Sequence, residues 1–163
     1  MTAPIPTNDL YNFPKLNLPQ YEFKIRQGFN SNYEIFDIFR KKYIILTPEE
    51  WVRQNFATYI VKYLNYPLSR IKLEYQISLA NNNYRADIVY FDKMLNPKII
   101  VECKSTKIKI NTNVFNQIAL YNMALSVKYL IVTNGITHYV AEIDYIHKKY
   151  NFLNIIPEFS ENI

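Results

Sequence analysis

The 163-residue chain contains one cysteine and two glycines, and it has no long run of hydrophobic residues or of like charges. A single cysteine excludes an internal disulfide framework and a zinc site built from several cysteines, so we expect a protein of the reducing cytoplasm. No apolar stretch approaches the roughly 20 residues that span a bilayer, and we expect no signal peptide and no membrane contact. The sequence lacks a glycine-rich phosphate-binding loop, which excludes an ATP-driven motor within these residues.

Hydrophobic residues make up 49% of the chain and aromatic residues 16%, which is ample for a packed core. Residues 1–20 hold four of the eight prolines and no periodic pattern, so we expect an extended N-terminal arm followed by one domain over residues 21–163. The net charge of +5 and the pI near 9.1 favour an anionic partner only mildly, because the lysines and arginines are scattered.

The hydrophobic pattern predicts an α/β fold. Short strands are expected within residues 21–46, and Thr47 and Pro48 begin a helix that runs to about Leu64. Three strands follow at 71–79, 84–91 and 98–104, then a helix at about 113–125 with Asn113 as its cap, and a strand that ends at the Asn134–Gly135 turn and is paired back by residues 137–144. The order αβββαβ is typical of a mixed central sheet flanked by helices, and the tail after residue 144 stays unassigned.

Two carboxylates interrupt the apolar strands 84–91 and 98–104, namely Asp87 and Glu102. Side chains two apart on a strand share a face, so we expect Asp87 to point with Val89, and Glu102 with Lys104. If Phe91 pairs with Lys98 at the end of the hairpin, Asp87 falls directly opposite Glu102. Like charges so placed are destabilising, so a positive group is expected beside them.

Lys104 supplies one positive charge against two carboxylates, so a hard divalent cation, Mg²⁺ or Mn²⁺, fits better. Asp87, Glu102 and the backbone carbonyl of Cys103 are the candidate ligands. A water bound to such an ion loses its proton more readily and can attack phosphorus, while Lys104 orients that water or stabilises the transition-state charge. A solvated sheet face with ordinary ion pairs stays open as the alternative, although the apolar neighbours favour a buried site.

The segments TPEEWVRQ, YRADIVYFD, IIVECKS, FNQIALYN and YLIVTNGITHYV follow one another between about Ile35 and Asp144. Asp87 and the Glu102-Cys103-Lys104 triplet in consecutive strands, between two helices, resemble the PD-(D/E)xK nuclease superfamily. The five segments resemble more specifically the N-terminal nuclease domain of type I restriction enzyme R subunits. The proline of the family name is absent, because Ala86 precedes Asp87. The resemblance implies a restriction-endonuclease-like αβββαβ core and a Mg²⁺-dependent DNA endonuclease.

The resemblance also implies roles for single residues. Asp87 and Glu102 would bind the metal and Lys104 would assist the attacking water. A first-helix glutamate would add an outer ligand. Glu50 is the candidate and Glu49 the alternative, although a capping box with Thr47 also explains Glu50.

Gln117 and Tyr121 lie four residues apart, on one face of the second helix. They match a Gln-x-x-x-Tyr element that borders the metal site in these nuclease families and contacts the DNA backbone. A polar pair on the helix surface, with the tyrosine packed on the sheet, stays open.

Other polar residues are expected to be structural. Cys103 should face away from Glu102 as part of the core, without a base to activate its thiol. His138 and His147 lack the spacing of metal ligands. Arg53 and Gln54 lie one turn after Glu50 and would hold that carboxylate, contact phosphate or face solvent.

R subunits of type I enzymes continue into a helicase motor that these residues lack. Restriction would therefore need partners: DNA, separate translocase or specificity subunits, and as a further candidate a second copy of the chain. Two functions remain open, a DNA endonuclease and a non-catalytic DNA-binding or assembly module that retains the nuclease fold. Asp87, Glu102, Lys104, Gln117 and Tyr121 together favour the enzyme, because a scaffold has no physical need for opposed carboxylates.

Overall fold

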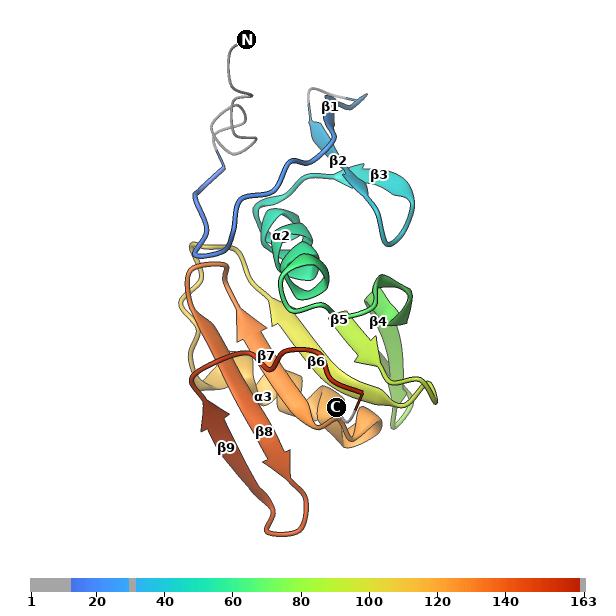
Figure 1. Ribbon diagram of the computed structural model, residues 1–163, viewed down its shortest axis with the longest axis vertical. Coiled ribbons are helices and arrows are strands. Elements are labelled where there is room, and N and C mark those ends of the chain that lie inside the picture. The colour runs from blue at the N-terminus through green and yellow to red at the C-terminus, as the bar shows by residue number, and fades with distance from the viewer. Residues whose placement is uncertain (1–12, 30–31, 162–163) are drawn as a thin grey trace.

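The computed structural model describes residues 13–29 and 32–161, which contain two sheets and two long helices (Figure 1). The smaller antiparallel sheet consists of β1 (Ile25–Gln27), β2 (Tyr33–Asp37) and β3 (Lys42–Ile45). The larger sheet follows chain order: β4 (Ile71–Leu79), β5 (Asn82–Phe91), β6 (Pro97–Cys103), β7 (Tyr129–Thr133), β8 (His138–Asp144) and β9 (Lys149–Leu153). The helices are α2 (Pro48–Lys62), α3 (Thr112–Leu125) and a short 3-10 turn at Leu68–Arg70.

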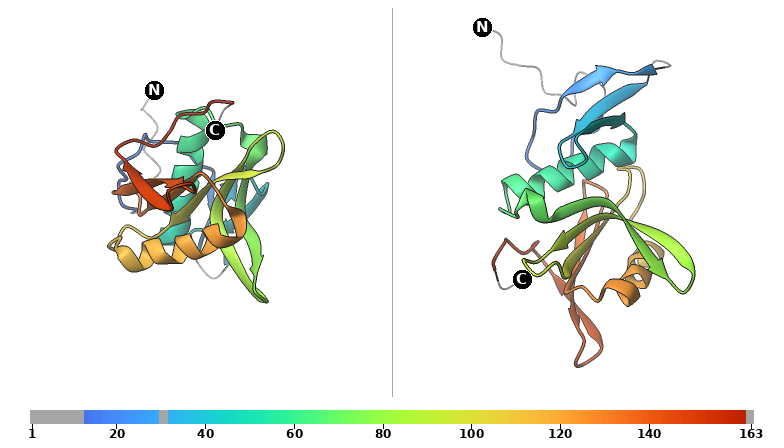
Figure 2. Two further views of the ribbon diagram at one scale, coloured as in Figure 1. Left: turned by 90° about the horizontal axis from the view of Figure 1, so that it is seen from below. Right: turned by 90° about the vertical axis from the view of Figure 1, so that its right-hand side faces the viewer.

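The layers place α2 between the two sheets and α3 on the far face of the larger one (Figure 2). Helix α2, the strands β4 to β6, helix α3 and strand β7 follow in that order, so the predicted αβββαβ core is confirmed. Among the pairings described in the larger sheet, only β6 and β7 run parallel, because α3 carries the chain back between them. None of the described helices is long and apolar enough to cross a membrane.

Helix α2 starts as predicted. The Thr47 hydroxyl accepts a hydrogen bond from the Glu50 backbone N–H at 3.1 Å, and Pro48 occupies the first turn. The helix ends at Lys62, two residues before the predicted Leu64. Its position between two sheets buries its polar side as well as its apolar side, so even Arg53 and Gln54 are buried. Their polar groups must therefore find partners inside the protein.

The predicted cap of the second helix is wrong. Helix α3 begins at Thr112, and the side chain of Asn111, not of Asn113, accepts hydrogen bonds from the backbone N–H groups of Asn113 and Val114. The side chain of Asn111 lies before the helix and can accept from backbone N–H groups of the first turn. Asn113 is already inside the helix, so its side chain cannot cap those groups.

The chain after β7 adds two antiparallel strands, β8 and β9, to the larger sheet. Gly135 has a φ of +82°, which suits glycine, and the predicted hairpin between β7 and β8 is confirmed. The unassigned tail forms β9, which pairs antiparallel with β8 at the edge of the sheet.

Residues 1–12 of the predicted arm lie outside the described residues. The described part is held in place, because the Trp51 indole donates to the Pro14 carbonyl at 3.2 Å and Leu16 is buried.

Two apolar clusters lie on opposite faces of the larger sheet. On the α2 side, Phe56 packs with Ile88, Val101 and Cys103 among others. On the α3 side, Ile118 packs in a cluster with Val89, Ile100 and Val132. Because both faces are covered, polar groups in the central strands are desolvated, and each charged one among them needs a partner.

Candidate functional site

The register of β5 and β6 carries the two predicted acids to the end of their ladder. Ile88 pairs with Val101, and Asp87 and Glu102 are the next residues along the two strands. The other end of the hairpin differs from the prediction, because Phe91 pairs with Pro97 and not with Lys98. A register shift after Tyr90 absorbs the extra residue, so the error at the turn does not reach the pairs of Tyr90, Val89 and Ile88.

Asp87 is buried and turns toward α2. Its Oδ1 accepts from Arg53 Nη2 at 2.6 Å, and its Oδ2 accepts from the backbone N–H of Cys103 at 2.7 Å. The expectation that Asp87 points with Val89 is wrong, because Val89 packs on the α3 side. The positive group expected beside the acids is, for Asp87, a buried guanidinium from the helix.

An irregularity in β4 explains this change of direction. Glu74 has a φ of +50°, which is uncommon for a residue with a side chain, and the ladder pairs Leu73 with Ile88 and Tyr75 with Ala86 on either side of it. Ala86 and Val89 both join the α3-side cluster, so the alternation of β5 breaks between them, at Asp87. Local backbone irregularities of this kind re-aim side chains, and they concentrate at functional sites.

Glu102 is buried, and Lys104 Nζ donates to its Oε1 at 2.7 Å. Burial and then the negative charge of Asp87 raise the pKa of Glu102 to about 7. Burial would lower the pKa of Lys104, but its hydrogen bond to Glu102 raises it instead. The Glu49 charge contributes to both pKa shifts. The charge of Asp87 therefore acts against ionisation of Glu102.

Glu50 is held by other side chains. It accepts from Arg40 Nη2 at 2.7 Å and Gln54 Nε2 at 2.8 Å, and it also bonds Arg53. Of the predicted roles for Arg53 and Gln54, the structure therefore supports holding this carboxylate. No group of three or more His, Cys, Asp or Glu side chains that could hold a metal ion is found in the described part of the chain, so Glu50 does not join Asp87 and Glu102 in one ligand group.

Arg40 is the residue that sequence reasoning missed. It follows β2 and reaches across from the smaller sheet to bond Asp37, Glu50 and Glu74. Arg53 in turn bonds Glu50 and Asp87, so one chain of ion pairs joins the smaller sheet to the candidate site. Buried charges persist when they are paired in this way, and no local sequence pattern announces a pairing between residues 34 positions apart.

The donor chemistry at Asp87 and Glu102 fits a hard divalent cation. Carboxylate and backbone carbonyl oxygens are the ligands that Mg²⁺ takes, and it keeps several waters of its own. The Asp87 carboxylate accepts from the Cys103 N–H, which places it against the β6 backbone next to Glu102. The acidic groups of the region outnumber its buried or half-buried cations: Asp37, Glu50, Glu74, Asp87 and Glu102 stand against Arg40, Arg53 and Lys104.

The other predicted residues occupy different positions. Cys103 is fully buried on the α2 side, as expected, and burial raises the pKa of its thiol, so it stays protonated. His138 packs against Phe56 with ring centroids 5.5 Å apart, and burial lowers its pKa. Gln117 and Tyr121 lie one turn apart on α3, but their side chains are outside the described residues.

The sequence model of the family described as "Type I restriction enzyme R protein N terminus (HSDR_N)" matches residues 48–157, which is more than half of the chain. The chain belongs to this family. No curated protein matches it. Among solved structures, it is similar to a fragment assigned as an HsdR subunit of a type I restriction enzyme from Vibrio vulnificus YJ016, with 21% sequence identity and a TM-score of 0.51. That similarity covers 69% of this chain and 24% of the other.

The family match identifies the N-terminal region of a type I R subunit, and the likeness to the solved structure agrees with a restriction-endonuclease-like α/β fold. The present chain spans about a quarter of the length of its structural relative. The R-protein family match begins at Pro48, the first residue of α2. The β1–β3 sheet, and with it Arg40, therefore precedes the segment that the family match covers.

Proposed function

We propose that the chain is a divalent-metal-dependent endonuclease that hydrolyses phosphodiester bonds in DNA, as the nuclease part of a type I restriction system. The observation that carries the proposal is the buried pair Asp87 and Glu102 on neighbouring strands, with Lys104 bonded to Glu102 at 2.7 Å. Two adjacent buried carboxylates are costly unless a cation binds there. DNA is the proposed substrate, and separate translocase or specificity subunits, or a second copy of the chain, are the proposed partners.

Asp87, Glu102 and the Cys103 carbonyl would hold Mg²⁺ or Mn²⁺, and water would complete the coordination. When bound, such an ion makes a coordinated water more acidic and offsets charge that develops on the phosphate. Lys104, which bonds Glu102, would donate a hydrogen bond to the attacking water or to a phosphate oxygen. Gln117 and Tyr121 would contact the DNA backbone from α3.

Arg53 acts on the site through Asp87. Its guanidinium bonds the Asp87 carboxylate by Nη2 and Nε, so it fixes the direction of one proposed ligand. The neighbouring carboxylates of Asp87 and Glu50 outweigh burial and raise the pKa of Arg53, so it remains charged. We therefore regard Arg53 as a positioning residue.

One observation favours the second candidate function, a DNA-binding or assembly module without catalysis. Asp87 already pairs with Arg53, and Glu102 already pairs with Lys104. A protein that had kept the fold and lost the reaction would satisfy its acids in the same way. The two functions differ in whether phosphodiester bonds are cut.

Cleavage distinguishes them. Purified wild-type chain would be incubated with supercoiled plasmid, single-stranded DNA and RNA in Mg²⁺ or Mn²⁺, beside Asp87→Asn and Glu102→Gln. Asp92→Asn is the matched control, because Asp92 lies at the β5–β6 turn, at the far end of the same hairpin. We expect wild type and control to nick plasmid, and each site variant to lose about 100-fold or more in rate. Equal nicking by all four proteins would refute the nuclease.

Metal binding can be tested without cleavage. A ligand that binds the folded state raises the melting temperature, so Mg²⁺ should stabilise wild type and Asp92→Asn, but not Glu102→Gln. Calorimetric titration would give the same ranking. If Glu102→Gln responds to Mg²⁺ as wild type does, the ion binds elsewhere and the proposed ligand set is wrong.

A further inference from the structure

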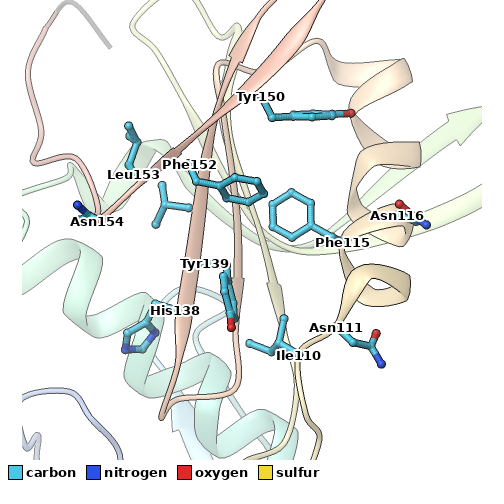
Figure 3. Close-up of a pocket in the computed structure, with 11 residues that line it drawn as sticks. Ile110, Asn111, Phe115, Asn116, His138, Tyr139, Tyr150, Phe152, Leu153 and Asn154 are labelled. Carbon is cyan, nitrogen blue, oxygen red and sulfur yellow. The ribbon is translucent and has the colours of Figure 1, made fainter.

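A groove of about 770 Å³ lies between helix α3 and the β8–β9 hairpin (Figure 3). Its aromatic lining consists of Phe115 from α3, Tyr139 from β8, and Tyr150 and Phe152 from β9. The rings of Phe115 and Phe152 meet edge to face with centroids 5.5 Å apart. The groove exists because α3 packs against β4 to β7 and leaves the outer part of the same sheet face uncovered.

The aromatic side chains of this groove are unusually open to solvent. Tyr139 is 43% exposed, Tyr150 52% and Phe152 65%. Single exposed aromatic residues are normal, but several that line one groove indicate a binding surface. Flat rings side by side on a sheet offer platforms for other flat rings.

The polar groups around the rings indicate what kind of ligand fits. Asn111, Asn116 and Asn154 contribute amides that donate and accept hydrogen bonds, and none of the described lining residues is acidic. Exposed lysines flank the groove in sequence, two before Ile110 and two before Tyr150: Lys107, Lys109, Lys148 and Lys149. Aromatic platforms and amides, with exposed lysines close by in the sequence, suit a ligand with planar bases and phosphates.

The strand register connects this groove to the candidate nuclease site. Glu102 pairs with Val132 on β7, and Val132 pairs with Tyr139 on β8. Neighbouring strands lie about 4.8 Å apart, so the backbones of Glu102 and Tyr139 are about 10 Å apart across the sheet. Residues 105–110 lead from Lys104 to Ile110 in the wall of the groove, and they include Lys107 and Lys109.

We propose that the groove binds unpaired bases of a nucleic-acid strand, stacked on Tyr139 and Phe152, beside the phosphate at the nuclease site. The inference rests on the proposed function for the identity of that strand as substrate. The bases must be unpaired, because paired bases in a duplex hide their faces in the stack. The asparagine amides bind base edges and the flanking lysines bind the backbone. A protein segment on the same surface is the competing occupant.

Binding in EDTA tests the groove without cleavage. Anisotropy of a fluorescein-labelled single-stranded 12-mer would be measured with wild type, Tyr139→Leu and Phe152→Leu, which remove a ring and keep apolar volume. Tyr63→Leu is the matched control, because Tyr63 is 60% exposed at the end of α2, on the opposite face of the sheet. We expect each groove variant to bind about tenfold more weakly and the control to bind as wild type.

Further measurements separate stacking from other effects. Tyr139→Phe keeps the ring and should retain wild-type affinity, and a fully paired duplex should bind all variants alike. Unchanged single-strand affinity in both leucine variants overturns the proposal. So does a change of oligomeric state in sedimentation with DNA affinity intact, which would identify a protein-docking surface. If wild type and the variants show the expected ranking of affinities in EDTA, but wild type does not nick DNA with metal, the proposed nuclease fails and the base-binding groove stands.

Discussion

At Arg53 one buried guanidinium bonds Glu49, Glu50 and Asp87. The sequence places this residue one helical turn after Glu50 and leaves its role undecided. The structure decides it through burial, because a charge with no access to water must be matched by the groups around it. The site acid Asp87 therefore depends on a cation from another element.

Replacing Arg53 should destabilise the fold strongly. Arg53→Met keeps much of the volume but leaves the buried carboxylate of Asp87 without its cation and takes one of two arginines from Glu50, so we expect a loss of about 3–5 kcal/mol in the free energy of unfolding. Urea denaturation would measure it. Arg85→Met is the control, because Arg85 is exposed and lies 3.4 Å from Glu74, and it should cost less than about 1 kcal/mol. Equal losses would mean that the buried ion pairs of Arg53 stabilise the fold no more than the exposed ion pair of Arg85 does.

Glu102 makes the stability of the metal-free protein depend on pH. Its folded-state pKa of about 7 lies above the ordinary value of 4.5, so the folded state holds a proton that the unfolded chain releases. The stability that this proton confers is complete below pH 4.5 and is lost as the pH rises through about 7. Denaturation at several pH values in EDTA should show the decline, and Glu102→Gln should flatten it. A decline of the same size in Glu102→Gln would assign it to another group.

At the scale of elements, the caps show where local chemistry suffices. Thr47 and Pro48 define the start of α2 because a cap and a first-turn proline are local features. For α3 the sequence analysis names Asn113 alone, although Asn111 and Thr112, which are also common capping residues, directly precede it. The choice among them depends on where the loop from β6 enters the helix, which tertiary contacts determine.

The two asparagines can be compared directly. Asn111→Ala removes the acceptor of two backbone N–H groups and should cost about 1 kcal/mol of stability. Asn113 is exposed within the first turn, so Asn113→Ala should change stability by less than about 0.5 kcal/mol. Thermal or urea denaturation measures both. The reverse ranking would place the helix start at the residue that the sequence analysis predicts.

The β5–β6 hairpin could be predicted because its register follows from the apolar pattern. The side chains that surround its two acids could not be predicted. The pairing of Ile88 with Val101, the residues next to the two acids, could be predicted from spacing alone. The Asp87 side chain points toward α2 where the neighbouring strand has a left-handed residue, Glu74. The Glu50 carboxylate is held in an ion pair by Arg40, which comes from the smaller sheet. Both depend on contacts between elements distant in sequence, which periodicity does not encode.

At the scale of the whole molecule, α2 is an inner layer with a sheet on each side (Figure 2). Its charged residues connect the layers, because Glu50 bonds both Arg40 next to the smaller sheet and Arg53. The smaller sheet is thus part of the support of the candidate site, and the site spans more of the chain than its strand acids suggest.

This layering has a consequence for where the domain can be cut. The family match starts at residue 48 and so suggests a fragment of residues 47–163, yet that fragment would expose one side of an interior helix and take from Glu50 one of its two arginine partners. We expect that fragment to aggregate or to melt at least about 10 °C below residues 13–163, since one buried surface and one ion-pair partner vanish together. Differential scanning calorimetry decides this. Matching melting temperatures would mean that residues 13–46 contribute nothing to stability, whereas a large drop would make them the cover that keeps water away from the interior face of α2.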